Sequence, residues 1–203
     1  MILKRILDIV LGVIGLIVTS PLWLYVIIRI KTEDQGPIFF VQERVGRNGQ
    51  LFQMYKFRSM VVDAEKKGAG IFVSSDDERI TRIGKFIRKT SIDELPQLIN
   101  VLKGEMSIVG PRPTLEYQVK RYNERQKRRL LVKPGITGWA QINGRNNMTW
   151  PEKIELDLWY IDHWNIGLDF KIIGRSIWSV LKRQGIYSEE GIIVDDISRP
   201  ETK

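Results

Sequence analysis

The sequence contains no cysteine, and His163 is its only histidine. Without cysteine the chain has neither a disulfide framework nor a thiolate metal site. A single histidine is more often a structural residue than a catalytic one. The Walker spacing with its Gly-Lys-Ser/Thr ending is also absent, which excludes a P-loop nucleotide site.

Acidic residues are the minority charge in this chain. It has 24 Asp and Glu against 32 Lys and Arg, which gives a net charge of +8. Such an excess of positive charge implies an anionic partner: a phosphate, a nucleotide, a nucleic acid or an acidic lipid surface. With 203 residues the chain is long enough for one domain with a substantial core.

Residues 9–28 form a run of twenty residues without any charge. As a helix this run is about 30 Å long, which is enough to cross the hydrocarbon core of a bilayer. The run is too long for a signal peptide, and no small-residue cleavage site follows it. We therefore expect a membrane anchor at the N-terminus.

Ser20 and Pro21 lie near the middle of this run. Proline removes a backbone hydrogen bond and bends a helix, and the Ser20 hydroxyl can satisfy part of the freed backbone. Cations flank the run on both sides, which gives no bias in orientation. Both a kinked transmembrane helix and a re-entrant helix with arms of about 12 residues agree with this pattern. The flanking cations are Lys4, Arg5, Arg29 and Lys31.

A β-hairpin is predicted after the anchor. Residues 38–41 have the composition of a short strand, residues 44–49 contain the turn dipeptide Asn-Gly, and residues 51–58 form the return strand. Alternation along the return strand places Lys56 and Arg58 on one face, near its end. Both are candidate phosphate ligands, although solvated strand cations are the simpler interpretation.

Residues 90–104 carry the adjacent carboxylates Asp93 and Glu94. The apolar residues that follow have the i, i+3, i+4, i+7 spacing of an amphipathic helix, and Gly104 is suited to its C-terminal end. The pair is therefore expected in the first turn of a helix, where unpaired N–H groups favour anions. The spaced apolar residues are Leu95, Leu98, Ile99 and Leu102.

A structural role for the same stretch is the main alternative. Ser91 and Glu94 have the spacing of a capping box, which requires no chemistry. Asp93 is a second candidate for the N-cap, and it would bring Pro96 into the tolerant first turn of the helix. Taken by itself, the capping box is the more common explanation of this pattern.

Three arginines outside the hairpin are candidate phosphate ligands. Arg88 lies close in sequence to the carboxylate pair. Arg112 stands between two prolines that stiffen its backbone, which suits bidentate recognition of phosphate, although a rigid surface turn has the same pattern. Arg145 ends the Gly-rich stretch 133–146, which we expect to be a loop that approaches a ligand closely.

The remaining segments are assigned from pattern alone. Residues 63–79 are predicted to form a loop and residues 80–89 a helix. Residues 112–133 are predicted to form a strongly basic helix. Its positive face either contacts anionic headgroups or is simply solvated. Two more helices are expected at residues 155–160 and 169–182. The second has an apolar stripe that faces either a membrane or the core, made by Ile173, Ile177, Trp178 and Leu181.

Several of these stretches, taken together, resemble the bacterial sugar transferases. These are the monotopic phosphoglycosyl transferases of polyprenyl-phosphate pathways. The resemblance extends in order over residues 1–187, and the chain is similar to the small form that has only the catalytic domain. It is carried by the Ser20-Pro21 anchor and by residues 55–60 (YKFRSM), 91–97 (SIDELPQ), 110–113 (GPRP) and 134–141 (PGITGWAQ).

The resemblance implies a reaction. Members transfer a phospho-sugar from a UDP-sugar to undecaprenyl phosphate and release UMP, with Mg²⁺ as cofactor. It also implies that Asp93 is the nucleophile and a magnesium ligand, with Glu94 as its partner carboxylate. Attack on a diphosphate must overcome its negative charge, which requires nearby cations. We assign this role to the candidate phosphate ligands named above. The product would serve downstream glycosyltransferases, and the sugar itself is not identified by any segment.

The resemblance also implies the fold and the location. We expect an α+β, mainly helical chain with a re-entrant helix broken at Ser20 and Pro21, a small hairpin and amphipathic interfacial helices. Residues 1–31 would be the anchor, residues 32–187 the catalytic domain and residues 188–203 a tail. The protein would lie on the cytoplasmic face of the bacterial inner membrane, beside anionic lipids.

Two other functions agree with parts of the sequence. A membrane-anchored binding protein for nucleic acid or anionic lipid would explain the positive charge, but not the carboxylate pair, and we expect no nucleic-acid partner. A magnesium phosphohydrolase that acts on lipid diphosphates could use the same pair with water as the acceptor. The products distinguish these possibilities.

Overall fold

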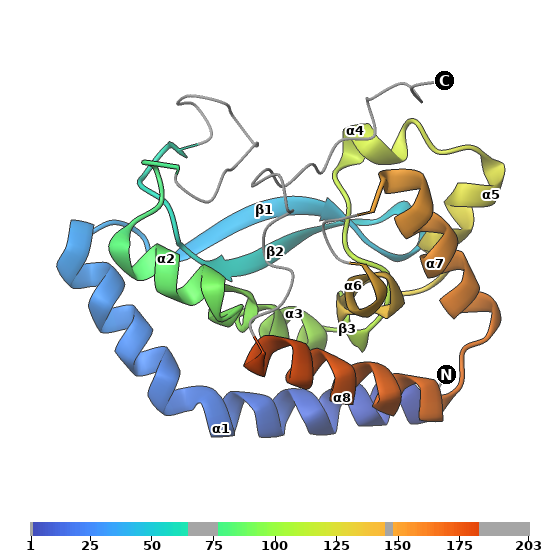
Figure 1. The fold of residues 1–203 in the computed structure, drawn as a ribbon, viewed down its shortest axis with the longest axis horizontal. Coiled ribbons are helices and arrows are strands. Elements are labelled where there is room, and N and C mark those ends of the chain that lie inside the picture. Colours follow the sequence, from blue (N-terminus) through green and yellow to red (C-terminus); the bar gives the residue numbers. More distant parts are fainter. Residues whose placement is uncertain (1, 65–76, 145–147, 183–203) are drawn as a thin grey trace.

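The computed structural model describes residues 2–64, 77–144 and 148–182 (Figure 1). The predicted loop 63–79 lies mostly outside these ranges, and Arg145 and the tail 188–203 lie entirely outside them. The described part is mainly helical, with a small antiparallel hairpin, so this part of the predicted fold class is confirmed.

Helix α1 (Ile2–Asp34) contains the whole apolar run and continues through Pro21. In Figure 1 it follows the lower edge of the molecule, bends, and rises on the left. Pro21 has no N–H with which to reach the carbonyl of Ile17 four residues earlier. The Ser20 hydroxyl donates to that same carbonyl over 2.8 Å, which confirms the predicted role of this side chain.

The predicted hairpin is confirmed, with a tighter turn. Strands β1 (Phe39–Val45) and β2 (Leu51–Phe57) pair antiparallel around the short 3₁₀ turn η1 (Arg47–Gly49). Asn48 and Gly49 both have positive φ, at 56° and 78°, as an Asn-Gly turn requires. The first strand is longer than predicted, because its pairing with β2 continues as far as Val45, which lies opposite Leu51.

The segment after the hairpin departs from the predicted pattern at the carboxylate pair. Helix α2 (Arg82–Lys89) begins after the N-cap Thr81 and buries Ile83 and Ile87. It is followed by a single 3₁₀ turn, η3 (Ile92–Glu94), and only then by helix α3 (Gln97–Lys103), which ends at Gly104 with φ 87°. The pair therefore precedes the helix instead of opening it.

A second, parallel strand pair was not predicted. Strands β3 (Ser107–Val109) and β4 (Gly135–Thr137) join segments that are 28 residues apart in the sequence. Glycines make the approach possible: a Cβ on Gly135 would lie 2.1 Å from the backbone nitrogen of Gly110. The predicted loop 133–146 is thus partly a strand, followed by the short helix α6 (Trp139–Asn143).

The basic segment 112–133 is not one helix. It forms α4 (Glu116–Val119), α5 (Glu124–Lys127) and the 3₁₀ turn η4 (Arg128–Leu131). The break is caused by buried Tyr122 and by Asn123, which caps α5. The two C-terminal helices are longer than predicted: α7 (Trp150–Asp162), with a capping box at Thr149, and α8 (Ile166–Leu181).

The largest apolar cluster lies between the second half of α1, the hairpin and α2. Val26 and Ile30 of α1 are buried against Phe57 and Ile87. Ile92, from the turn that carries the carboxylates, packs on the same cluster. The turn η3 thus packs on the same core as the second half of α1.

Candidate active site

The carboxylate pair lies in a turn whose backbone is set by Ser91. Ser91 has φ 56°, in the left-handed region, and its side chain makes no capping hydrogen bond. Pro96, not Ser91 or Asp93, occupies the N-cap position of α3. Both predicted N-caps are therefore wrong, and the capping box does not explain Glu94.

Glu94 lies between two cations that come from distant segments. Its Oε1 atom accepts a hydrogen bond from Nζ of Lys56 over 2.8 Å and another from Nη2 of Arg112 over 3.1 Å. The Lys56 and Glu94 side chains are each 19% exposed, whereas that of Arg112 is 45% exposed. Burial would raise the pKa of Glu94, but the two cations hold it well below its ordinary value.

The pKa of Asp93 is shifted in the opposite direction from that of Glu94. None of the described residues donates a hydrogen bond to its carboxylate. Burial and the negative charge of Glu94 raise its pKa to about 6, against the effect of Lys56, Arg88 and Arg112. The two neighbouring carboxylates therefore differ: Glu94 is held by cations, while Asp93 has oxygen atoms available for a substrate or a metal ion.

Asn100 joins the strand that carries Lys56 to the helix that follows Glu94. Its fully buried amide accepts from the N–H of Tyr55 over 3.1 Å and donates to the carbonyl of Gln53 over 2.7 Å. These bonds attach α3 to the backbone of β2, one residue before Lys56. Asn100 was not predicted as a site residue, because a buried asparagine on a helix has no distinctive local pattern.

The predicted phosphate ligands fall into two groups. Lys56 and Arg112 contact Glu94, and Arg88 is near enough to lower the pKa of Asp93. The structure separates Arg58 from this group: its guanidinium forms a bidentate pair with Asp34 at the end of α1 and also donates to the carbonyl of Pro37. Arg145 lies outside the described residues.

Both ends of α1 are bonded to the domain that carries the pair. Near the start, Nζ of Lys4 lies 2.7 Å from Oδ2 of Asp169 in α8, and buried Asp8 accepts from the Ser107 hydroxyl over 2.8 Å. Near the end, the Glu33 carboxylate accepts from the first N–H groups of α2. Neither Asp8 nor Glu33 was predicted from the sequence.

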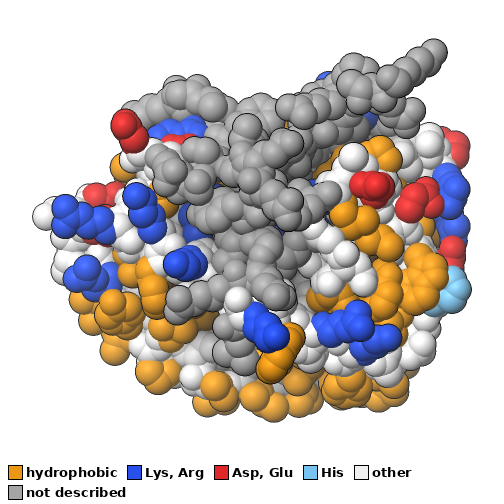
Figure 2. Space-filling view, in the orientation of Figure 1, with side chains coloured by type: hydrophobic (Ala, Val, Ile, Leu, Met, Phe, Trp, Pro, Cys, Tyr) orange, Lys and Arg blue, Asp and Glu red, His pale blue; other side chains and the backbone are white. Residues whose placement is uncertain are grey.

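Exposed apolar side chains gather on one edge of the molecule. Figure 2 shows them along the lower edge, where Figure 1 places α1 and α8. Of the predicted α8 stripe, Ile177 and Trp178 are exposed, at 57% and 59%, whereas Ile173 packs partly into the core. By length and composition alone, α1 could cross a membrane. His163 lies at the C-terminal end of α7 and stacks on Trp159 at a ring distance of 4.5 Å.

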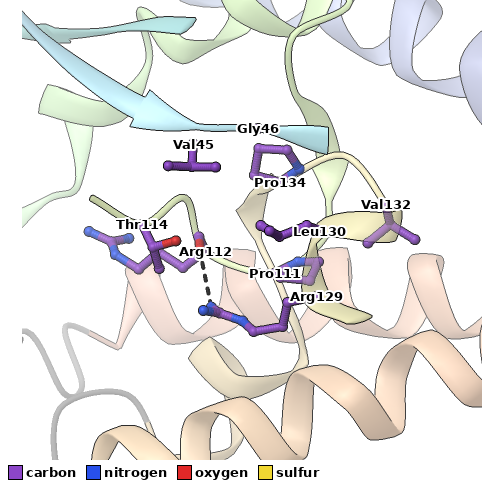
Figure 3. Close-up of a pocket in the computed structure, with 9 residues that line it drawn as sticks. All are labelled: Val45, Gly46, Pro111, Arg112, Thr114, Arg129, Leu130, Val132 and Pro134. Atoms are coloured by element: carbon purple, nitrogen blue, oxygen red, sulfur yellow. Dashed lines mark hydrogen bonds between the residues drawn. The ribbon is translucent and has the colours of Figure 1, made fainter. Parts of the chain in front are cut away.

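A small cavity lies behind the loop of Pro111, Arg112 and Pro113, which we call the Arg112 loop (Figure 3). The figure shows the Arg112 side chain extending away from the cavity, while its carbonyl oxygen accepts a hydrogen bond from buried Arg129 over 3.2 Å. Pro111 and Pro113 on either side are buried. The backbone of this loop is therefore held on the inner side by Arg129, and the Arg112 guanidinium points outward, toward Glu94.

The sequence profile of the bacterial sugar transferases matches residues 1–183. The chain belongs to this family. It is 48% identical over 186 residues to the uncharacterized sugar transferase EpsL of Bacillus subtilis, a match that covers 92% of this chain and 91% of that protein. The family resemblance found in the sequence is thereby confirmed.

Two further family members are longer than this chain. The galactosyl transferase CpsE of Streptococcus agalactiae is 50% identical over 196 residues, and the undecaprenyl-phosphate galactose phosphotransferase of Salmonella typhimurium is 42% identical over 199 residues. Each match covers 91% of this chain, but only 43% and 42% of those proteins. The chain therefore spans less than half of either relative.

Proposed function

We propose that this protein transfers a phospho-sugar from a UDP-sugar to undecaprenyl phosphate, producing undecaprenyl-diphospho-sugar and UMP. The observation that carries the proposal is the division of the carboxylate pair. Glu94 is bound by Lys56 and Arg112, while Asp93 has no hydrogen-bond donor among the described residues. The name of the Salmonella relative, a phosphotransferase to undecaprenyl phosphate, supports the same reaction.

In this proposal Asp93 is the nucleophile. One of its oxygen atoms attacks the phosphorus that bears the sugar, the bond from that phosphorus to the UMP oxygen breaks, and UMP leaves. The resulting acyl-phosphate divides one displacement into two. An oxygen of undecaprenyl phosphate then attacks the same phosphorus and regenerates the Asp93 carboxylate. Glu94 positions or deprotonates this acceptor, and Arg88, Arg112 and Lys56 stabilise the phosphate charge.

The carboxylates present are compatible with Mg²⁺. The structure has no group of three carboxylate or histidine ligands among its described residues. Magnesium does not need three protein ligands in enzymes that act on phosphates, because one or two carboxylates and the substrate phosphates usually suffice. Asp93 is the residue that would hold the ion, since the oxygen Oε1 of Glu94 already accepts from two cations. When bound, the ion would neutralise charge on the diphosphate.

We further propose that α1 is re-entrant and that the protein lies on the cytoplasmic face of the inner membrane. The bonds that join Lys4, Asp8, Glu33 and Asp34 to one domain support this, since a straight span would carry one end of α1 away. The apolar edge formed by α1 and α8 would lie among lipids, with anionic headgroups beside the surrounding cations. The pair would then meet the lipid phosphate near the headgroup plane.

The test is a panel of UDP-sugars with undecaprenyl phosphate and Mg²⁺, in which both UMP and the lipid product are measured. We expect UMP and lipid-linked diphospho-sugar in equal amounts with at least one donor. Free phospho-sugar without a lipid product would identify a phosphohydrolase instead. Salt-dependent binding of nucleic acid or anionic lipid, without turnover of any UDP-sugar, would support a binding protein. The panel also identifies the sugar.

A further inference from the structure

A buried ion pair lies directly behind the Arg112 loop. Arg129, in η4, and Asp157, in α7, are 4% and 1% exposed, and Nη2 of Arg129 is 2.7 Å from Oδ2 of Asp157. Nε of Arg129 donates to the same oxygen over 2.8 Å, and Nη1 donates to the Tyr122 hydroxyl. The guanidinium also lies over the ring of Trp150, at 5.3 Å from its centre.

Stability alone is a weak explanation for this pair. Removing two charges from water costs several kcal/mol, and an apolar pair of similar volume is often as stable. Hydrogen bonds also compensate only part of the cost of burying these polar groups. Oδ1 of Asp157 and Nε1 of Trp150 are buried without any hydrogen-bond partner among the described residues. The cost of burying this pair therefore favours a role beyond stability.

The remaining contact of Arg129 leads to the candidate active site. Its Nη2 atom donates to the carbonyl oxygen of Arg112 over 3.2 Å (Figure 3). Pro111 and Pro113 fix φ on both sides of Arg112, so that a hydrogen bond to this carbonyl restrains the whole loop. Arg112 in turn donates to Oε1 of Glu94. A continuous set of contacts therefore joins Asp157, in α7, to the carboxylate pair.

We propose that Arg129, held by Asp157 and Tyr122, is a positioning residue that aims the Arg112 guanidinium at Glu94 and at the substrate phosphate. It acts through Arg112 and does not touch the substrate. A guanidinium is suited to this role because its planar fork donates in three fixed directions at once: to Asp157, to Tyr122 and to the Arg112 carbonyl. This inference rests on the proposed function of the Asp93–Glu94 pair.

The first arm of the test is a double-mutant cycle on kcat/KM for UMP release. Arg129→Lys keeps the charge but cannot bind all three partners, and we expect a loss of about tenfold, which corresponds to about 1.4 kcal/mol. If Arg129 acts through Arg112, the same change should cost less than about twofold in an Arg112→Ala background, because coupled residues are not additive. Equal losses in both backgrounds would overturn the proposal.

The matched control is Arg128→Lys. Arg128 is the adjacent residue in the same turn, and it also pairs with an aspartate, Asp162, but at the surface, with 43% of its side chain exposed. We expect Arg128→Lys to leave kcat/KM unchanged. Should Arg129→Lys fail to fold, Tyr122→Phe removes one partner of Arg129 without changing the shape of the core. The same cycle with Tyr122→Phe must then show a smaller loss that disappears in the Arg112→Ala background, and a loss that persists overturns the proposal.

The second arm needs no substrate, and so it separates this inference from the proposed function. Nitrogen relaxation of the Arg112 Nε–H group reports how firmly its guanidinium is held. We expect its order parameter to fall in Arg129→Lys, or in Tyr122→Phe if that variant is used, and to be unchanged in Arg128→Lys. An unchanged order parameter overturns the positioning role, whether or not the enzyme proves active. If instead the wild-type protein releases no UMP from any donor, the proposed function fails while this arm still decides the positioning role.

Discussion

Nζ of Lys56 donates a hydrogen bond of 2.8 Å to Oε1 of Glu94, although 38 residues separate them in the sequence. Lys56 comes from the hairpin, and Glu94 from the turn between α2 and α3. Burial raises the pKa of Asp93, the same cation lowers it, and the net value is about 6. One lysine thus affects both carboxylates in different ways, as a hydrogen-bond donor to one and as a nearby charge to the other.

The pH dependence of the reaction should therefore report on Lys56. Asp93 attacks only as a carboxylate, so the exchange of UMP into UDP-sugar should fall about tenfold per pH unit below pH about 6. Replacing Lys56 by Met removes a charge that lowers the pKa of Asp93. The acidic limb of the pH–rate profile should then move to higher pH, with a loss of at least tenfold at pH 7.

A second lysine provides the control for this measurement. Lys103, at the end of α3, pairs with Glu105 over 2.9 Å, and its side chain is 44% exposed. Lys103→Met removes the same charge from a lysine–glutamate pair that does not contact the Asp93–Glu94 pair. Its pH–rate profile should match that of the wild type. An acidic limb that stays in place in Lys56→Met would contradict the electrostatic role assigned to Lys56.

Arg58 should behave as a structural residue, in contrast to Lys56. Its side chain is 6% exposed and holds Asp34 at the end of α1. Arg58→Lys keeps the charge but loses the bidentate fork, so we expect the free energy of unfolding to fall by about 1–3 kcal/mol. The KM for the UDP-sugar should not change. A raised KM without a lower melting temperature would instead support the sequence prediction that Arg58 binds phosphate.

The difference between Lys56 and Arg58 shows what could be predicted from this sequence. The Asn-Gly turn located the hairpin correctly. Alternation predicted that Lys56 and Arg58 project together from one face, but the structure gives them separate partners. The partners could not be predicted, because Glu94 and Asp34 lie in other segments. Asn100 joins α3 to β2, and Arg58, the residue after β2, pairs with Asp34 of α1. Both are tertiary contacts that have no local pattern.

The Asp93–Glu94 turn was mispredicted for a related reason. Ser91 and Glu94 have the spacing of a capping box, and this local preference predicts a helix start. Tertiary packing prevails: Ser91 takes a positive φ, Ile92 packs on the core beside α1, and Glu94 binds cations from elsewhere. The same holds for Arg129 and Asp157, whose pairing links two segments 28 residues apart.

The re-entrant arrangement can be tested by labelling with a membrane-impermeant maleimide. The chain has no cysteine, so that single cysteines at Leu3 and Lys31 can be introduced without background. Both side chains are exposed, whereas Glu33 is avoided because it caps α2. In inverted membrane vesicles, both cysteines should react. Reaction of only one of them would show that α1 spans the membrane.

Pro21→Ala extends the labelling experiment. Alanine restores the N–H that Pro21 lacks, so the carbonyl of Ile17 regains its helical partner in place of the Ser20 hydroxyl. A straighter helix should result, and we expect part of the population to span the membrane. In that population, only one of the two cysteines would react from each side. A labelling pattern identical to that with Pro21 would mean that the bend does not depend on proline.

The division of labour between Asp93 and Glu94 is tested most directly by separating the two half-reactions. Exchange of UMP into UDP-sugar needs no lipid acceptor, and so it isolates the first displacement. Asp93→Asn should abolish both exchange and lipid product formation. Glu94→Gln should reduce lipid product formation more than exchange, because Glu94 serves the acceptor step. If Glu94 were only a structural partner for Lys56 and Arg112, both half-reactions should fall by the same factor.

The covalent intermediate gives the decisive measurement. Wild-type protein incubated with UDP-sugar alone should gain the mass of the phospho-sugar on the peptide that contains Asp93, since no acceptor removes it. Asp93→Asn should show no such gain. Absence of the adduct from wild-type protein, together with absence of exchange, would indicate direct transfer with donor and acceptor bound at once. Asp93 would then keep only its role as the magnesium ligand and would not be the nucleophile.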